Sequence, residues 1–171
     1  MLAGSNWRPL TALLTLIVAL ALQIGVNYAN DYSDGIRGTD ENRVGPTRLT
    51  AAGLAPANSV KRAAFISFAV AAIAGLVVAS LSSWWVLFVG ALALIAAWGY
   101  TGGKNPYGYR GLGEFSVFLF FGVVATVGTF YVQTLQITFA AWAASIPMGA
   151  LSCALLVINN IRDRKRDSEV G

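Results

Sequence analysis

The sequence indicates an all-α protein, a polytopic transmembrane bundle of about five helices. Of its 171 residues, 56% are hydrophobic and only 12% are charged, whereas a soluble domain carries about 25% charged residues. The apolar residues are gathered in five long stretches, and a helix needs about 20 such residues to cross the hydrocarbon core of a bilayer. No repeat or composition change divides the chain, so we treat 1–171 as a single membrane domain.

Each expected helix is bounded by polar or turn-forming residues. The first begins near Pro9 and ends at an acidic cluster around Asp31; because no small-residue cleavage site precedes that cluster, we expect a retained span and not a signal peptide. A polar segment then leads to the second helix, which a tight link at 81–84 joins to the third. A glycine- and tyrosine-rich loop, 102–113, precedes the fourth. The five expected spans are 9–30, 60–81, 84–101, 114–133 and 137–160.

The charged residues are unevenly divided between the two ends of the expected bundle. If the spans alternate in direction, the 31–59 segment, the 102–113 loop and the C-terminal tail share one end. That end holds eleven of the twelve Lys and Arg residues, all but Arg8, together with all eight acidic residues. The positive-inside rule makes it cytoplasmic, and we expect the plasma membrane as the location. The basic residues follow membrane topology, so nucleic acid is not an expected partner.

The rarest residue types exclude several kinds of site. The sequence has no histidine, so no imidazole can act as a base or a metal ligand. Cys153 is the only cysteine, which excludes an internal disulfide and a cysteine-rich zinc site. It lies in an apolar stretch, where we expect the thiol to pack as a small hydrophobic group.

A polar cluster lies at the cytoplasmic end of the first expected span. Asn27, Asn30, Asp31 and Asp34 are three or four residues apart, so on a helix they form one polar stripe. Polar groups at this depth are costly unless they face protein or water, and the stripe is therefore expected to face the bundle. Carboxylates are the oxygen ligands that Mg²⁺ takes together with substrate phosphates. A bound cation would also relieve the repulsion between the neighbouring acids.

A second cluster, at the end of the fifth expected span, has the same spacing. Asn159, Asn160, Asp163 and Asp167 fall at steps of three or four residues, and basic residues such as Arg162 surround them. One such cluster alone fits a capped helix end followed by a solvated run of charges equally well. Two clusters at one end favour a functional site, since polar residues within membrane segments are functional candidates by default.

The two loops at this end add candidate phosphate ligands. Arg43 and Arg48 lie in the first loop, and Lys104 lies in the second beside glycines whose backbone amides can approach a phosphate. The second loop is not a P-loop, because the Gly-x4-Gly-Lys-Ser/Thr spacing is absent. Each basic residue taken alone also fits the topology rule. Two roles are open for Glu114, which begins the fourth span: a favourable interaction with the helix dipole, or an ion pair with Lys104.

Together these motifs resemble those of the UbiA-type intramembrane prenyltransferases. The resemblance covers essentially the whole chain. Asn30-Asp31-x-x-Asp34 is similar to the first aspartate-rich motif of that family, and Asp163-x-x-x-Asp167 is similar to its second.

Two longer strings, 27–40 and 100–114, resemble one branch of the family, the 1,4-dihydroxy-2-naphthoate polyprenyltransferases that make demethylmenaquinone. Where the wider family often has a third acid, this chain has Gly38, and Asp40 follows it. Family members usually have about nine spans. The resemblance therefore implies that this chain starts inside the equivalent of the second span, stops just after the second motif, and is an incomplete domain.

The resemblance implies Mg²⁺-dependent transfer of a polyprenyl group from polyprenyl diphosphate to 1,4-dihydroxy-2-naphthoate, with loss of CO2. Mg²⁺ would bridge the diphosphate to both acidic motifs, and the apolar spans would hold the isoprenoid tail. The implied catalytic residues are Asp31, Asp34, Asp163 and Asp167. The implied metal ligands are Asn30, Asp31, Asp34, Asp163 and Asp167. The implied substrate-binding residues are Asn27, Arg43, Lys104, Tyr109, Asn160 and Arg162.

Two other interpretations stay open. One is a small multi-span transporter of a divalent cation or an anionic solute, although transporters place their sites near the bilayer midplane and the charges here gather at the helix ends. The other is an inactive fragment of a prenyltransferase. Metal-dependent release of pyrophosphate would separate an active enzyme from both. The acceptor 4-hydroxybenzoate, the prenyl chain length and the oligomeric state are also left open.

Overall fold

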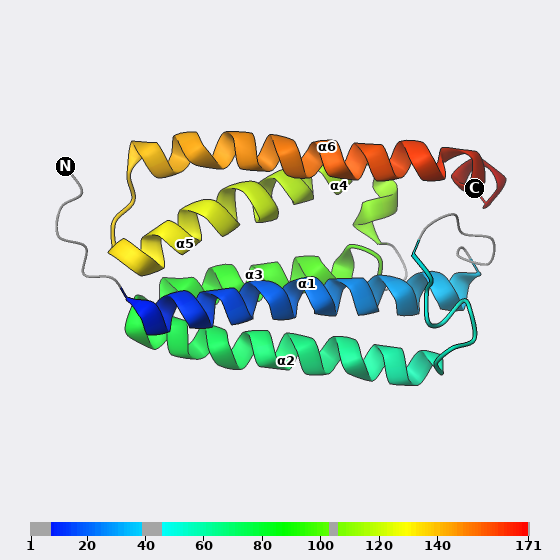
Figure 1. The fold of residues 1–171 in the computed structure, drawn as a ribbon, viewed down its shortest axis with the longest axis horizontal. Helices are drawn as coiled ribbons and strands as arrows, with labels where there is room; N and C mark the ends of the chain where they lie inside the picture. The colour runs from blue at the N-terminus through cyan, green and yellow to red at the C-terminus, as the bar shows by residue number, and fades with distance from the viewer. Residues whose placement is uncertain (1–7, 39–45, 103–105, 171) are drawn as a thin grey trace.

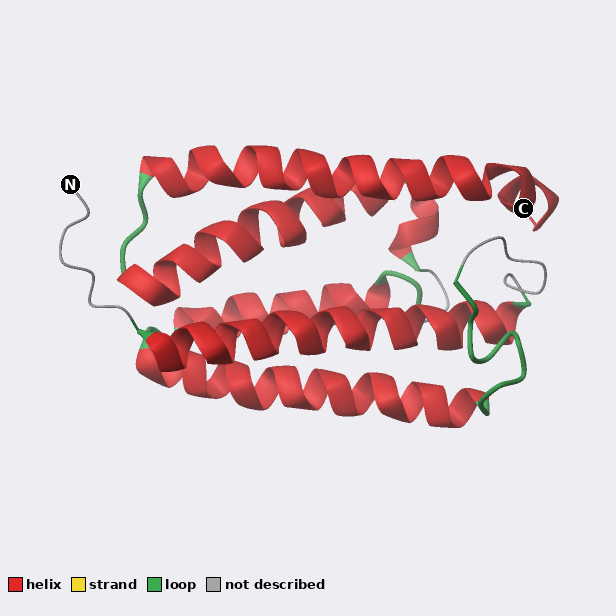
Figure 2. Cartoon of the chain, in the orientation of Figure 1, coloured by secondary structure: helices red, strands yellow, loops and turns green. Residues whose placement is uncertain are grey.

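The computed structural model describes residues 8–38, 46–102 and 106–170, with the side chains of Tyr109 and 163–170 left aside. All regular structure in these ranges is helical, which confirms the predicted all-α class (Figure 2). The elements are α1 (Pro9–Arg37), α2 (Ala57–Leu81), α3 (Trp85–Gly99), η1 (Tyr107–Arg110), α4 (Gly113–Val117), η2 (Phe118–Val124), α5 (Ala125–Thr134) and α6 (Phe139–Val170).

Four of the described helices are long and apolar enough to cross a membrane. They are α1, α2, the continuous rod Gly113–Thr134 that joins α4, η2 and α5, and the Phe139–Arg162 part of α6. The third expected span is shorter than predicted, since α3 has only 15 residues. Large apolar side chains such as Phe139, 87% exposed, cover the outside of the bundle. This is the surface of a multi-pass membrane protein, because lipid is the solvent that such side chains require.

The first helix continues past its apolar stretch. Its start has proline in the first turn, a position where the missing N–H costs nothing. Its end is Gly38, whose left-handed φ of 73° lets its N–H reach the carbonyl oxygens of Asp34 and Gly35. Hydropathy places the end of the span near residue 30, whereas the helix continues to Arg37 and ends at the Gly38 cap. The acidic cluster therefore lies inside the last turns of α1.

The helices form two groups (Figure 1). In one, α1 packs on α2 and α3; in the other, α6 packs on α4, η2 and α5. The contact of α1 with α2 depends on small residues: a Cβ added at Gly25 would lie 2.5 Å from Cε1 of Phe68, which is buried with Ala29 and Ala64. In the second group the backbones of Gly122 in η2 and Gly149 in α6 touch.

The helices run in alternating directions, as the charge pattern requires. The C-terminal ends of α1, α3 and α6 lie at one end of the bundle (Figure 1). At the other end, the Arg8 guanidinium joins the two groups, because it donates to the carbonyl oxygen of Val132 at 2.8 Å and to that of Leu81. The helix α6 continues through Pro147 without ending.

Candidate functional site

The two acidic motifs lie at the same end of the bundle. Helix α1 has 29 residues and α6 has 32, and at 1.5 Å per residue they are about 44 and 48 Å long. Both exceed the roughly 30 Å of the hydrocarbon core, so each helix carries its motif on a stretch that reaches beyond the apolar layer. Asp163 and Asp167 are on the last turns of α6, but their side chains are not among those described. Arg43 and Lys104 lie outside the described residues, as does the side chain of Tyr109.

The polar stripe expected on α1 is divided between two neighbours. Asn27 and Asp31 face the segment that follows the first loop, Pro46–Leu49. Asn30 instead meets the segment just after α3. The stripe was predicted from helical spacing alone, and that spacing does not tell which packed element each side chain meets. The division gives the two halves of the motif different surroundings.

Asp31 is almost fully buried, with 5% of its surface exposed. One carboxylate oxygen accepts the backbone N–H of Leu49 at 2.8 Å, and the other accepts that of Thr50 at 2.9 Å. Hydrogen bonds to a charged carboxylate are about twice as strong as neutral ones. No sequence pattern indicates these partners, since every residue but proline carries a backbone N–H.

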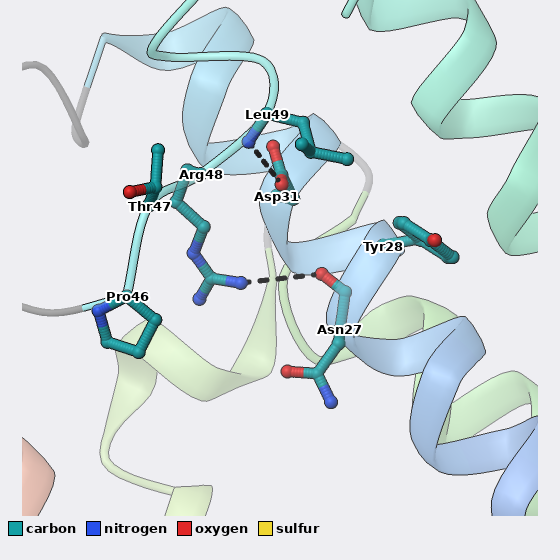
Figure 3. A pocket seen from close by; sticks show the side chains of 7 residues that line it. All are labelled: Asn27, Tyr28, Asp31, Pro46, Thr47, Arg48 and Leu49. Atoms are coloured by element: carbon teal, nitrogen blue, oxygen red, sulfur yellow. Dashed lines mark hydrogen bonds between the residues drawn. The ribbon is translucent and has the colours of Figure 1, made fainter. Parts of the chain in front are cut away.

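A cavity of about 300 Å³ opens beside Asp31 (Figure 3). Arg48 leans over α1 into this cavity, and its Nη1 lies 3.5 Å from the carbonyl oxygen of Asn27. The lining combines a guanidinium, a carboxamide and an aromatic ring with the Asp31 carboxylate, whose oxygens already accept two backbone N–H groups. The guanidinium suits an anionic ligand. The lining residues are Asn27, Tyr28, Asp31, Pro46, Thr47, Arg48 and Leu49.

The other half of the motif meets the end of α3. The Thr101 hydroxyl donates to Oδ1 of Asn30 at 2.6 Å, and Arg37 Nη1 donates to the Thr101 carbonyl oxygen at 2.7 Å. Thr101 is 5% exposed. Neither Arg37 nor Thr101 was singled out from the sequence; a polar residue directly after an apolar helix was the only available sign of Thr101. Together they fix the orientation of the Asn30 carboxamide.

Tyr100 connects this face of α1 with α4. Burial raises the pKa of the Tyr100 phenol, and the charges of Tyr107, Glu114 and Asp34 raise it further. The carboxylates of Asp34 and Glu114 therefore both disfavour ionisation of the Tyr100 phenol, which stays protonated at neutral pH.

Glu114 extends the site to α6. Its carboxylate accepts Asn160 Nδ2 at 3.4 Å, and its carbonyl oxygen accepts the Cys153 thiol at 3.2 Å. The sequence predicts two roles for Glu114, and the structure adds a third, a long hydrogen bond to Asn160 in the second polar cluster. The thiol was expected only to pack, and it also serves as a donor. Arg162 is the last residue of α6 whose side chain is described, and it is exposed.

The whole chain, 1–171, matches the model of the UbiA prenyltransferase family. The chain belongs to the UbiA prenyltransferase family. This confirms the resemblance drawn from the aspartate-rich motifs.

Individual relatives in the family are similar to this chain over most of its length. A 1,4-dihydroxy-2-naphthoate octaprenyltransferase of Mycobacterium tuberculosis is 57% identical over 157 residues, which cover 92% of this chain and 54% of the relative. The protein of the same name from Escherichia coli is 39% identical, over 97% of this chain and 56% of the relative. The chain thus spans about half the length of these relatives. No solved structure matches it.

The donor chemistry of the candidate site suits a hard cation. Carboxamide and carboxylate oxygens are what Mg²⁺ prefers, usually completed by water and substrate phosphates. Asn30 and Asp34 supply such oxygens on one face of α1. Among the described residues no three acidic, histidine or cysteine side chains come together. A complete coordination shell would thus need oxygens from outside that set, such as phosphate or the acids of the second motif.

Proposed function

We propose that this chain supplies the diphosphate-binding end of a polyprenyltransferase. The donor is a polyprenyl diphosphate, and the acceptor is 1,4-dihydroxy-2-naphthoate. The observation that carries the proposal is the common position of the two acidic helix ends, α1 and α6, at one end of the bundle (Figure 1). The names of the relatives support the acceptor. We also propose that this end is cytoplasmic, as the positive-inside rule favours, and that the membrane is the plasma membrane.

The proposed metal ligands are Asn30 and Asp34 on α1 and Asp163 and Asp167 on α6. Bound there, Mg²⁺ would act as a Lewis acid that neutralises charge on the diphosphate. The hydrogen bond from Thr101 holds Asn30 Oδ1 in place, and a fixed orientation is what a ligand of a small octahedral ion requires. Asp31, which helical spacing groups with these ligands, accepts the backbone N–H groups of Leu49 and Thr50 on its two carboxylate oxygens.

Basic and polar side chains would bind and orient the diphosphate. Arg48 stands over α1 in the described cavity, and a guanidinium matches phosphate oxygens with two parallel donors. Asn27 lines the same cavity. Arg43, Lys104, Tyr109, Asn160 and Arg162 are the further candidates for substrate contacts.

The reaction itself is an alkylation with loss of a carboxylate. The C–O bond of the donor breaks, and diphosphate leaves with the electron pair. The allylic cation that remains is attacked by the ring carbon that bears the carboxylate, and a C–C bond forms. The carboxylate then leaves as CO2, and its bonding pair restores the aromatic ring. Apolar helix surfaces keep water away from the cation.

A prenyl-transfer assay on the 171-residue chain tests the proposal. The purified chain, in detergent or bilayers, is given labelled octaprenyl diphosphate with Mg²⁺ and either dihydroxynaphthoate or 4-hydroxybenzoate. We expect chelator-sensitive product with dihydroxynaphthoate alone, and its loss in Asp34→Asn. Product with hydroxybenzoate would overturn the acceptor. Cation flux in liposomes without any product would overturn the enzyme and favour a transporter.

A further inference from the structure

Asp31 holds a segment of the chain that is distant in sequence. Its two oxygens accept the N–H groups of two successive residues, Leu49 and Thr50. A carboxylate that accepts one N–H on each oxygen fixes both the position and the rotation of the peptide group it meets. Because the Asp31 side chain is 5% exposed, water does not compete for these bonds.

The two amides belong to the start of a compact turn. The Leu49 carbonyl oxygen accepts the N–H groups of Leu54 and Ala55 at 2.9 and 3.1 Å, and the Thr50 carbonyl oxygen accepts that of Gly53 at 3.1 Å. The first N–H groups of such a turn have no partner inside it. Asp31 thus caps this turn from another element, as an N-cap residue does within its own helix.

The turn also lies flat against α1. A Cβ added at Gly35 would lie 2.5 Å from Cβ and Cγ2 of Thr50 and 3.4 Å from the N of Ala51. Gly35 is four residues after Asp31 and therefore on the same face of the helix. This face of α1, marked by Asp31 and Gly35, is shaped to receive the turn.

The opposite half of the motif is built differently. Asn30 meets Thr101, and Asp34 acts on Tyr100, both at the end of α3. We propose that Asp31 is a positioning residue and not a metal ligand. It fixes the segment 46–55 on α1 and so sets Arg48 above Asn27, in the cavity proposed for the diphosphate. The consequence for Arg48 rests on the proposed function; the docking of the turn does not.

Hydrogen exchange of the Leu49 and Thr50 amides tests the docking directly. In the whole chain in detergent micelles, Asp31→Asn leaves one oxygen and turns an amide donor towards the second N–H. We expect exchange at these two amides to accelerate about tenfold or more. Gly35→Ala, which leaves the carboxylate intact but displaces Thr50, should accelerate the same two amides.

The matched control is Asp34→Asn, the same chemical change one turn along the helix. It should leave exchange at Leu49 and Thr50 within about twofold of the unmodified chain. Equal acceleration in Asp31→Asn and Asp34→Asn, with the chain still folded by circular dichroism, would mean that the motif acts as one unit. Unchanged exchange in Asp31→Asn would show that the turn is held otherwise. Either result overturns the docking.

The functional arm uses the transfer reaction. Asp31→Asn should raise KM for the polyprenyl diphosphate about tenfold while the Mg²⁺ concentration for half-maximal rate stays unchanged. If Asp31 acts through Arg48, the double variant with Arg48→Gln should be no worse than Arg48→Gln alone. A raised Mg²⁺ requirement, or fully additive effects, would overturn the positioning role. An inactive unmodified chain would count against the proposed function only, since the exchange experiment needs no turnover.

Discussion

Gly122→Ala is expected to weaken the packing of α6 against η2. An ideal Cβ at this position would lie 2.5 Å from Gly149 Cα, 2.8 Å from Gly149 N and 3.1 Å from the Ser145 carbonyl oxygen. Ordinary contact begins at 3.4 Å, so the nearest atom is 0.9 Å too close. All three neighbours are backbone atoms, which no side-chain rotation can move. The two helices must therefore separate.

The size of the effect follows from two opposing contributions. Overpacking of a well-packed contact costs about 1–3 kcal/mol. Replacing glycine by alanine within a helix returns roughly 0.5–1 kcal/mol, because the unfolded chain loses less entropy. We expect a net loss of about 1–2 kcal/mol in the free energy of unfolding. Close backbone approach at small residues is a common source of helix association in membranes. The loss therefore reflects weaker association of the rod Gly113–Thr134 with α6.

Unfolding in detergent, followed by circular dichroism, measures this loss. Gly128→Ala is the matched control: it is the same substitution in the same rod, and an added Cβ there meets nothing within 4 Å. That variant should be slightly more stable than the unmodified chain. If Gly122→Ala unfolds at the same midpoint as Gly128→Ala, the backbones of η2 and α6 are not in contact and the reasoning is refuted.

Three further predictions concern polar anchors. Arg8→Gln should lower stability by about 1–3 kcal/mol in the same unfolding assay, because two helix-end carbonyls lose a charged donor; an unchanged midpoint would contradict this. Tyr107→Phe should cost about 1 kcal/mol, since its hydroxyl donates to the Ala96 carbonyl oxygen at 2.8 Å and lies 2.9 Å from Ser116 Oγ; Ser116→Ala, which spares the bond to Ala96, should cost less. Burial raises the pKa of Tyr100 above its ordinary value of about 10. The neutral phenol therefore stabilises the fold below pH ~10, and this contribution is lost as pH rises through the raised pKa. Tyr100→Phe should flatten the alkaline fall in the free energy of unfolding, and a profile identical to that of the unmodified chain would contradict the assignment.

Hydropathy and charge predicted most of the fold. The order and directions of the spans follow from where apolar stretches stop and basic residues gather. The ends of the helices depend on local backbone conformation and not on hydropathy. Helix α1 passes its apolar limit because no residue breaks it before Gly38, where a left-handed cap is available. Helix α3 is shorter than predicted: it runs from Trp85 to Gly99, and the flanking Trp84 and Tyr100 still have right-handed helical dihedrals. Hydropathy alone does not distinguish such flanking aromatic residues from helical ones.

The sequence names candidate residues for the site but none of their contacts. Helical spacing correctly grouped Asn27 to Asp34 at one helix end. It did not separate the Asp31 side from the Asn30 side, because that depends on which segments pack there. The bond of Arg37 to Thr101 joins residues 64 positions apart, and the partners of Asp31 are backbone amides. Neither kind of contact leaves a pattern in the sequence.

The π-helical segment η2 gives the fourth rod a built-in phase shift. Between Phe118 and Val124 the backbone makes wider turns than an α-helix does, so α4 and α5 are not in the rotational register that a straight α-helix would give them. Glu114 lies before this offset in the rod, and the buried Val127 and Val132 lie after it. A π-helical turn holds more residues than an α-helical turn, so the offset depends on how many residues lie between Phe118 and Val124. The number of residues in this stretch therefore determines which faces of α4 and α5 meet the neighbouring helices, whatever those residues are.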